Sequence, residues 1–174
     1  MFELIDQTSK TPPPVQQNLI QNASFEDVTS GKPSGWLSAD QIQVDASAKH
    51  TGNVSLRIGP SGSLASQNIK LSPNTYYYFS YWIKARNLDN DVAGMRVIQT
   101  QPTLVYLTSL AWHQSGSFDW VKRVGFFKTP PDTQNIRVDI VWELNPGQVF
   151  WVDDVTLCRM DQPCPDEYLS ERLS

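Results

Sequence analysis

The stretch TYYYFSYWIKA, residues 75–85, decides the fold class of this chain. Apolar and aromatic side chains occupy both of its alternating sets: Tyr77, Phe79, Tyr81 and Ile83 on one side, and Tyr76, Tyr78 and Trp82 on the other. Side chains of a β-strand point alternately to its two faces. The stretch therefore predicts a strand that is covered on both faces, or one that presents a face to a flat partner.

Residues 136–143 alternate more cleanly. Ile136, Val138, Ile140 and Trp142 face one way, and Arg137, Asp139, Val141 and Glu143 face the other. Glycine, proline, asparagine, serine and threonine recur about every eight to twelve residues between such segments, the spacing of a β-sandwich or barrel. The sequence predicts an all-β chain with strands near residues 18–26, 41–47, 53–59, 64–71, 75–85, 94–101, 104–110, 117–128, 135–144 and 148–158.

The length of 174 residues suits one domain with a sizeable core. Residues 1–16 contain three consecutive prolines, which favour an extended arm over a helix or a central strand. We expect the domain over residues 17–158 and a polar C-terminal tail, a second arm, over residues 159–174. Cys158 and Cys164 are the only cysteines, and their spacing in a β-rich chain favours a disulfide that pins the tail over two free thiols.

Charge and hydropathy limit the partners and the location. The net charge is −4, the isoelectric point is about 5.0 and the basic residues are scattered, so we expect no nucleic-acid partner. No apolar run approaches the roughly 20 residues of a membrane-spanning helix. The N-terminal sequence MFELIDQTSK does not look like a signal peptide. We expect an extracellular, surface or virion-associated protein whose signal was removed or which is released by another route.

Catalytic motifs are missing from the sequence. It has no G-x-S-x-G elbow, H-E-x-x-H helix or phosphate-binding glycine loop, and its only histidines are His50 and His113. Asp139 and Glu143 could serve as the two carboxylates of a glycosidase. On one strand, however, their backbones would lie about 13 Å apart, which makes them a poor acid and base for a reaction that requires carboxylates roughly 5–10 Å apart. We expect a non-catalytic protein.

Four segments of the chain stand in a characteristic order. They are NLIQNASFE (18–26) with PSGW (33–36), HTGNVSLRI (50–58), YYFSYWIKA (77–85) with FDWVKRVGFFKTP (118–130), and FWVDDVTL (150–157). On these segments the chain resembles the calcium-containing carbohydrate-binding modules of the cellulose- and xylan-binding type, which are appended to xylanases and endoglucanases. The resemblance implies a two-sheet antiparallel β-sandwich (jelly roll), a structural calcium ion, and a glycan bound on the concave sheet or at the loop end.

Acidic residues at both ends of the domain make physical sense of the implied calcium. Glu26 ends the first predicted strand, and Asp153 has the parity of Leu157, so its side chain should point inward. A buried carboxylate is costly unless it is paired or binds a metal. If the first and last strands are neighbours, Glu26, Asp153 and Asp154, with a carbonyl near Lys49, could supply the oxygen ligands that Ca²⁺ takes. The alternative is that these acids are hydrogen-bonded to turn amides.

Aromatic residues are plentiful enough for a sugar-binding platform, with six Trp, six Tyr and seven Phe. Pyranose rings stack on exposed aromatic rings, while arginine, amide and carboxylate groups bind the hydroxyls. Large aromatics are more often buried, and we expect this of Trp36, Tyr77, Phe79, Trp120, Phe126 and Trp151. The predicted platform comprises Tyr78, Tyr106, Trp112 and Trp142, with Arg96, Gln99, Arg137 and Glu143 as polar partners.

Two functions from different classes are consistent with these features. The first is a module that binds a polysaccharide or surface glycan. The second is a structural or assembly protein, such as a virion decoration or tail-associated protein. In that role the jelly roll would be a spacer or host-surface attachment domain, and the arms would dock it into a homo-oligomer or larger assembly. The fold cannot separate these functions, because function depends on the sites that a fold carries.

Overall fold

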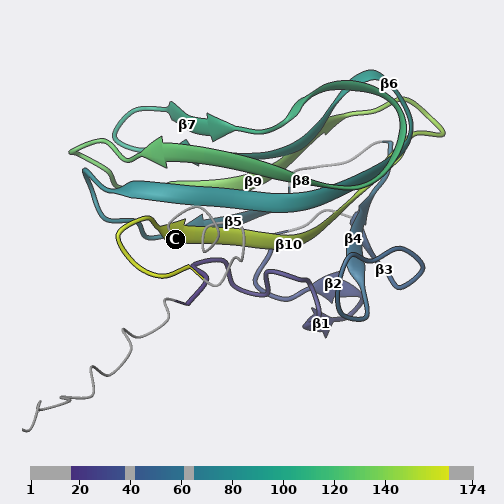
Figure 1. Cartoon of the computed structure of the whole chain (residues 1–174), viewed down its shortest axis with the longest axis horizontal. Coiled ribbons are helices and arrows are strands. Elements are labelled where there is room, and N and C mark those ends of the chain that lie inside the picture. Colours follow the sequence, from purple (N-terminus) through teal and green to yellow (C-terminus); the bar gives the residue numbers. More distant parts are fainter. Residues whose placement is uncertain (1–16, 38–41, 61–64, 165–174) are drawn as a thin grey trace, which may run out of the picture.

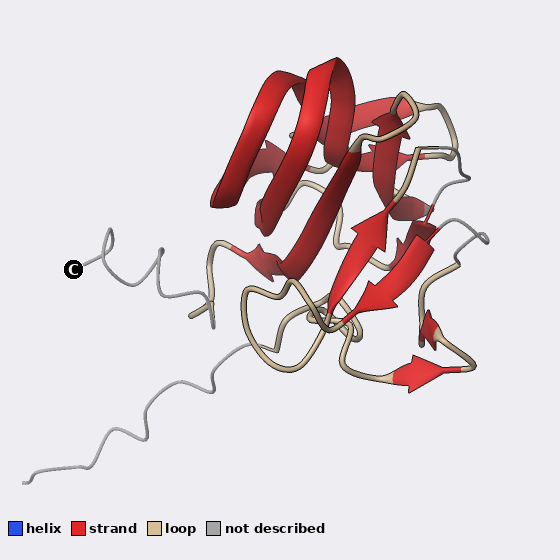
Figure 2. Ribbon diagram, turned by 90° about the vertical axis from the view of Figure 1, so that its right-hand side faces the viewer, coloured by secondary structure: helices blue, strands red, loops and turns tan. Residues whose placement is uncertain are grey.

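The computed structural model describes residues 17–37, 42–60 and 65–164, and this part of the chain forms strands and loops without a helix (Figure 2). The strands are β1 (Val28–Thr29), β2 (Lys32–Pro33), β3 (Ile42–Asp45), β4 (Ser55–Ile58), β5 (Ala65–Ile69), β6 (Tyr76–Gln99), β7 (Val105–Ser109), β8 (Trp112–Lys128), β9 (Ile136–Glu143) and β10 (Val149–Arg159). The predicted all-β sandwich is confirmed. None of the described segments forms a helix able to span a membrane.

Strand β6 runs through both layers of the sandwich. Its first half, residues 76–86, pairs with β10 and with most of β8, and its second half, residues 92–99, pairs with β9, with β7 and, at Val92 and Ala93, with the start of β8. The strand bends between these halves (Figure 1). Asn87, which lies between them, has a φ of 59°. The first layer has the order β3-β4-β10-β6-β8, and the second has the order β5-β9-β6-β7. All of these pairings are antiparallel.

The two side-chain sets of residues 75–85 have different surroundings. Tyr77, Phe79, Tyr81 and Ile83 are buried in the core between the layers. The other set lies on the outer face of the first layer, which is only partly covered, since Tyr78 is buried while Tyr76 is exposed. The apolar side chains of one set therefore lie in the core, and those of the other set lie on an outer face that is only partly covered.

The opening segment, residues 18–26, is not the predicted strand, although it lies beside the last strand. Backbone hydrogen bonds join Leu19 N–H to the Leu157 carbonyl (2.9 Å) and Val155 N–H to the Ala23 carbonyl (2.9 Å). Between them, the Asn18 side chain donates to the Val155 carbonyl (2.7 Å) and accepts from Leu157 N–H (3.0 Å). A side chain thus occupies positions that backbone groups would fill in a regular ladder, and the segment runs as turns.

The C-terminal tail begins on the outer face of the first layer. Cys158, at the end of β10, is joined to Cys164 in a disulfide, with a Cα–Cα separation of 5.8 Å. Met160 N–H donates to the Tyr76 carbonyl (3.0 Å), which holds the first tail residues against β6. The N-terminal arm at residues 1–16 and tail residues 165–174 lie outside the described residues.

Candidate functional site

The outer face of the second layer brings several of the predicted glycan-binding residues together. Ile136, Val138 and Ile140 of β9 are buried in the core, so Arg137 and Glu143 project from the opposite side. On the neighbouring strand β6, Arg96 projects from the same side, because it is paired with Asp139. Strand β7 extends the face, with Ser109 paired to Arg96 and Tyr106 paired to Ile98.

An open hollow of about 350 Å³ lies on this face. Its lining residues are Val92, Arg96, Ser109, Ala111, Ile140, Val141, Trp142 and Glu143. The volume is at the lower end of the roughly 300–1,000 Å³ of small-molecule sites. The hollow thus combines apolar side chains with a cation, an acid and a hydroxyl, the mixture that a sugar ring requires.

Asp139 organises the cationic end of this face. Its side chain is fully buried, and its two oxygens accept hydrogen bonds from two arginines. Arg137 donates from Nε to Oδ1 (2.6 Å) and from Nη2 to Oδ2 (3.1 Å), while Arg96 donates from Nε to Oδ2 (3.2 Å). These bonds fix the orientation of both guanidinium groups, which are partly exposed.

The three predicted aromatics on the side of the second layer differ in what they offer a ligand. Tyr106 is 58% exposed, and the Arg96 guanidinium carbon lies 5.4 Å from its ring centroid. Trp142 lines the hollow, but it alternates with Glu143 on β9 and pairs with the buried Ala93, so its side chain lies on the inner side of the layer, packed against the core. The backbone of Trp112 pairs with Ala93, and its side chain lies outside the described part of the chain.

Two predicted ligand residues are not on this surface, and those predictions are wrong. Tyr78 lies on the outer face of the other layer, between its paired neighbours Phe126 and Cys158, and is completely buried. Gln99 lies two residues after Val97, on the same face of β6, and pairs with Ile136. It therefore points into the interior, where it is also completely buried. The opposite error concerns Phe126, which was expected in the core and is 48% exposed.

Sequence reasoning missed Asp139 as part of this site, as well as Ser109 and Ala111. It considered Asp139 only as a catalytic acid. The available signal was the pattern R-x-D in residues 137–139, because residues two apart on a strand share a face. Ser109 and Ala111 are small residues beside β6, and nothing in their local sequence marks them.

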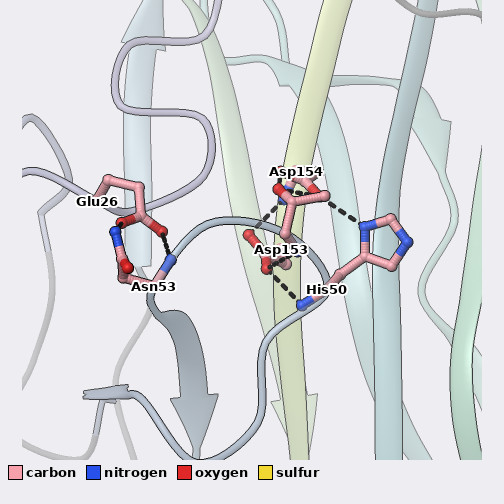
Figure 3. Close-up of polar contacts among 6 residues, drawn as sticks. Glu26, His50, Asn53, Asp153 and Asp154 are labelled. Atoms are coloured by element: carbon pink, nitrogen blue, oxygen red, sulfur yellow. Dashed lines mark hydrogen bonds and ion pairs between the residues drawn. The ribbon is translucent and has the colours of Figure 1, made fainter.

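A second polar cluster surrounds the loop of residues 49–54. The Asp153 carboxylate accepts hydrogen bonds from the N–H groups of His50 (2.8 Å) and Thr51 (3.3 Å). Further along the same loop, Glu26 accepts from the N–H groups of Asn53 (2.8 Å) and Val54 (3.1 Å). Figure 3 shows Glu26 beside Asn53 and Asp153 beside His50, so the two acids bind separate parts of one loop.

The expectation that Asp153 points into the core is wrong. A β-bulge interrupts β10, where Asp153 is paired with Trp82 but Thr156 is paired with Ser80. The extra residue in β10 reverses the parity, and Asp154 has a φ of 46° there. Asp153 therefore lies on the outer face of the first layer and is buried under the loop.

Asp154 holds the same loop by its side chain. One of its oxygens lies 2.6 Å from His50 Nδ1 (Figure 3). Thr51 Oγ1 donates to the other oxygen at 2.7 Å. The His50 ring stacks on Trp82, with a centroid separation of 3.8 Å and an interplanar angle of 17°. The loop is thus joined to β10 and β6 by both polar and aromatic contacts.

The acids at this loop have shifted pKa values of opposite sign. Burial raises the pKa of Asp153 to about 6, and the nearby Asp154 charge adds to this, although the N–H groups of His50 and Thr51 oppose it. Hydrogen bonds from Val54 and Asn53 lower the pKa of Glu26, and the positive charge of Lys49 adds slightly. Asp153 is the acid whose ionised form is poorly stabilised.

The donor atoms at this loop are of the kind that calcium binds, but they are occupied by amides. Glu26, Asp153 and Asp154 supply carboxylate oxygens, the hard ligands that Ca²⁺ prefers. Each of these carboxylates already accepts hydrogen bonds from the loop. Among the described residues, no group of three or more His, Cys, Asp or Glu side chains is placed to hold a metal ion. Calcium here would need backbone carbonyls for most of its ligand shell.

Comparisons with known proteins bear on the whole domain. Residues 17–146 match the family model described as "Carbohydrate binding domain". No curated protein sequence matches the chain. Among solved structures, the chain is similar to TmCBM61 in complex with β-1,4-galactotriose, with a TM-score of 0.63 and 21% identity over 83% of this chain and 99% of that chain.

Two further solved structures have the same fold. One is the CBM22-1 xylan-binding domain of Paenibacillus barcinonensis Xyn10C, with a TM-score of 0.60 and 15% identity over 83% of this chain and 96% of that one. The other is the enzymatically active domain of bacteriophage CBA120 tailspike protein 4, with a TM-score of 0.57 and 17% identity. The match to the tailspike covers 82% of this chain but only 21% of that chain. At these identities the likeness concerns the fold alone.

Proposed function

The chain belongs to the carbohydrate binding domain family, and from this premise we propose that it binds a glycan chain on the outer face of the second layer. The observation that carries the proposal is the hollow beside Arg96, with Trp142 and Glu143 in its lining and the exposed Tyr106 next to it. An exposed ring offers stacking for the apolar face of a pyranose, and the charged groups offer hydrogen bonds to its hydroxyls.

A non-catalytic role is the best account of the acids on this face. Asp139 is covered by Arg96 and Arg137, which hold its two oxygens. Glu143 is four residues further along β9, about 13 Å away at the rise of a strand. With their backbones this far apart, and with Asp139 covered, the two residues are a poor acid and base for one glycosidic bond, which requires carboxylates about 5–10 Å apart.

The proposal is tested by calorimetric titration with soluble xylan, β-glucan, β-1,4-galactan, polygalacturonate and bacterial surface polysaccharides. We expect binding to at least one polymer, and about tenfold weaker binding of that polymer in Tyr106→Ala. Absence of binding across this panel, for a protein shown to be folded by its thermal melt, contradicts the proposal. Extracellular or surface localisation is part of the same proposal, because the ligands are polymers of cell walls and surfaces.

A second candidate function is attachment or assembly on a virus particle. The similarity to part of a phage tailspike protein favours it, because a domain of this fold occurs there within a much longer chain. In this role the glycan-binding face would recognise the host surface, and the terminal arms would join the domain to its neighbours. Light scattering of the full chain against residues 17–164 tests it: arm-dependent oligomers are expected, and a monomer in both cases contradicts it.

We also propose that the loop of residues 49–54 holds a structural calcium ion, as the family resemblance implies. Glu26 and Asp153 would supply its carboxylate ligands, with Asp154 nearby and a carbonyl near Lys49. The fully buried Asp153, whose pKa is raised, supports the proposal, because a cation would compensate its charge. The ion would hold the loop on β10 and would take no part in glycan binding.

A further inference from the structure

The arginines of the glycan-binding face carry more positive charge than the structure neutralises. Arg96 and Arg137 share one carboxylate, that of the buried Asp139. In the part of the chain that the structure describes, no other acid lies within ion-pair distance of either guanidinium. Two cations and one anion leave an excess of one positive charge, in a protein whose net charge is −4.

This excess charge has free donors. Arg96 contacts Asp139 through Nε alone, and Arg137 through Nε and Nη2. The terminal nitrogens of Arg96 and Nη1 of Arg137 make no hydrogen bond to any described residue. Because Asp139 fixes the guanidinium planes, these donors are held in place before a ligand arrives, which reduces the entropy cost of binding.

A binding surface for a sugar ring is adjacent to these donors. Tyr106 is 58% exposed, and the Arg96 guanidinium lies over one face of its ring, 5.4 Å from the centroid, so a sugar would stack on the part of the ring that Arg96 leaves open. A ring stacked on Tyr106 would carry its substituents towards the arginines. Planar, bidentate recognition of this kind suits carboxylates and phosphates better than single hydroxyls.

We propose that this face selects glycans that carry carboxylate groups, with a uronic acid stacked on Tyr106 and its carboxylate bound by Arg96 and Arg137. The proposal rests on the function proposed above and specifies the class of glycan. Glu143 is four residues from Asp139 on β9, so its backbone lies roughly 13 Å further along the strand and its negative charge belongs to the other end of the face. The acidic sugar therefore lies at the arginine end, and the Glu143 end takes a neutral sugar.

The test uses matched pairs of ligands that differ only in the carboxylate. Polygalacturonate and glucuronoxylan are titrated into the full-length protein by calorimetry, each beside its carboxyl-reduced product. We expect at least one acidic polymer to bind about tenfold more tightly than its reduced partner, the effect of one charge-assisted hydrogen bond pair. Its affinity should fall with added NaCl, while the affinity for the neutral polymer should not.

Failure of this inference is distinguishable from failure of the proposed function. Equal affinity for the acidic and reduced members of both pairs overturns the carboxylate preference and leaves glycan binding intact. Binding to neutral xylan, β-glucan or galactan alone overturns the carboxylate preference in the same way. Binding to no polymer at all overturns the glycan-binding function as well.

Substitutions then locate the contact. Arg96→Gln and Arg137→Gln should each reduce the affinity for the acidic polymer about tenfold and change that for its reduced partner little. The matched control is Arg57→Gln, which removes the same charge from β4 in the other layer and should have no effect. Thermal melts identify any variant that loses stability. If a variant is destabilised, the carboxylate preference is judged instead from the ligand pairs and the salt dependence measured on the unmodified protein. An equal loss of affinity in Arg57→Gln contradicts the assigned contact.

Discussion

Tyr81 and Met95 belong to one strand, yet the backbone N–H of Met95 donates a hydrogen bond to the hydroxyl of Tyr81 at 3.2 Å. The contact is possible because β6 bends and its second half faces its first across the sandwich (Figure 1). The same hydroxyl donates to the Leu110 carbonyl at 2.9 Å. A single side chain of the first layer therefore bonds two backbone groups of the second.

We predict that Tyr81→Phe lowers the free energy of unfolding by about 1–3 kcal/mol, because it leaves a buried N–H and a partly buried carbonyl without this partner. Denaturant unfolding measures the change. The matched control is Tyr76→Phe, whose side chain is 59% exposed and should change the stability by less than about 0.5 kcal/mol. Equal stability of Tyr81→Phe and the unmodified protein would contradict this role of the hydroxyl at the bend.

Much of the fold could be predicted from the sequence, because strand periodicity is a local signal. Both alternating sets of residues 75–85 and the cleaner alternation at residues 136–143 correspond to strands β6 and β9. The errors arise where the backbone hydrogen-bond pattern is irregular. Asn18 prevents a regular ladder in the opening segment, and the bulge at Asp154 reverses the parity of Asp153.

The candidate site was harder to predict than the strands. The alternation of side chains shows on which face of a sheet a residue lies, but not whether other residues cover that face. Tyr78 and Tyr106 are both strand tyrosines on outward faces, yet Tyr78 is covered by its neighbours and Tyr106 is 58% exposed. Gln99 has a polar side chain but the parity of the core. Whether such a residue is buried or exposed depends on the packing of the two layers and on the C-terminal disulfide loop.

Tyr106 and Tyr78 should respond differently to truncation. Tyr106→Ala should weaken glycan binding about tenfold with little change in melting temperature, because an exposed ring contributes stacking to the ligand and little to the core. Tyr78→Ala should instead lower the free energy of unfolding by about 3–5 kcal/mol, as for a buried aromatic. Calorimetric titration and thermal melts distinguish them. A Tyr106→Ala protein with unchanged glycan affinity would argue against the platform.

The pKa of Asp153 predicts a pH dependence of stability. Burial raises it from 3.8 to about 6, so the folded protein holds this proton at pH values where the unfolded chain has released it. Stability from this residue is therefore fully present below about pH 4 and is lost as the pH rises to about 6, by no more than about 3 kcal/mol. Comparing the protein with Asp153→Asn in EDTA isolates this residue. A difference in unfolding free energy that is flat from pH 4 to pH 7 contradicts the prediction.

Bound calcium should reverse that dependence. A carboxylate must be deprotonated to bind the ion, so with calcium present the stability should increase as the pH rises through the same range. Millimolar CaCl₂ at pH 7 should raise the melting temperature by mass action, and EDTA should lower it to the metal-free value. Asp153→Asn is the control and should respond weakly. A melting temperature unchanged by both additions would remove calcium from this loop.

The central claim is that the outer face of the second layer is the glycan site. It is tested most directly by a ¹H–¹⁵N NMR titration of the full chain with a short oligosaccharide of the polymer that binds most tightly in calorimetry. We predict that the shifted amides lie in residues 92–98, 105–109 and 137–143, and that β4, β10 and the loop of residues 49–54 do not shift. Shifts confined to that loop or to the outer face of the first layer would contradict the claim.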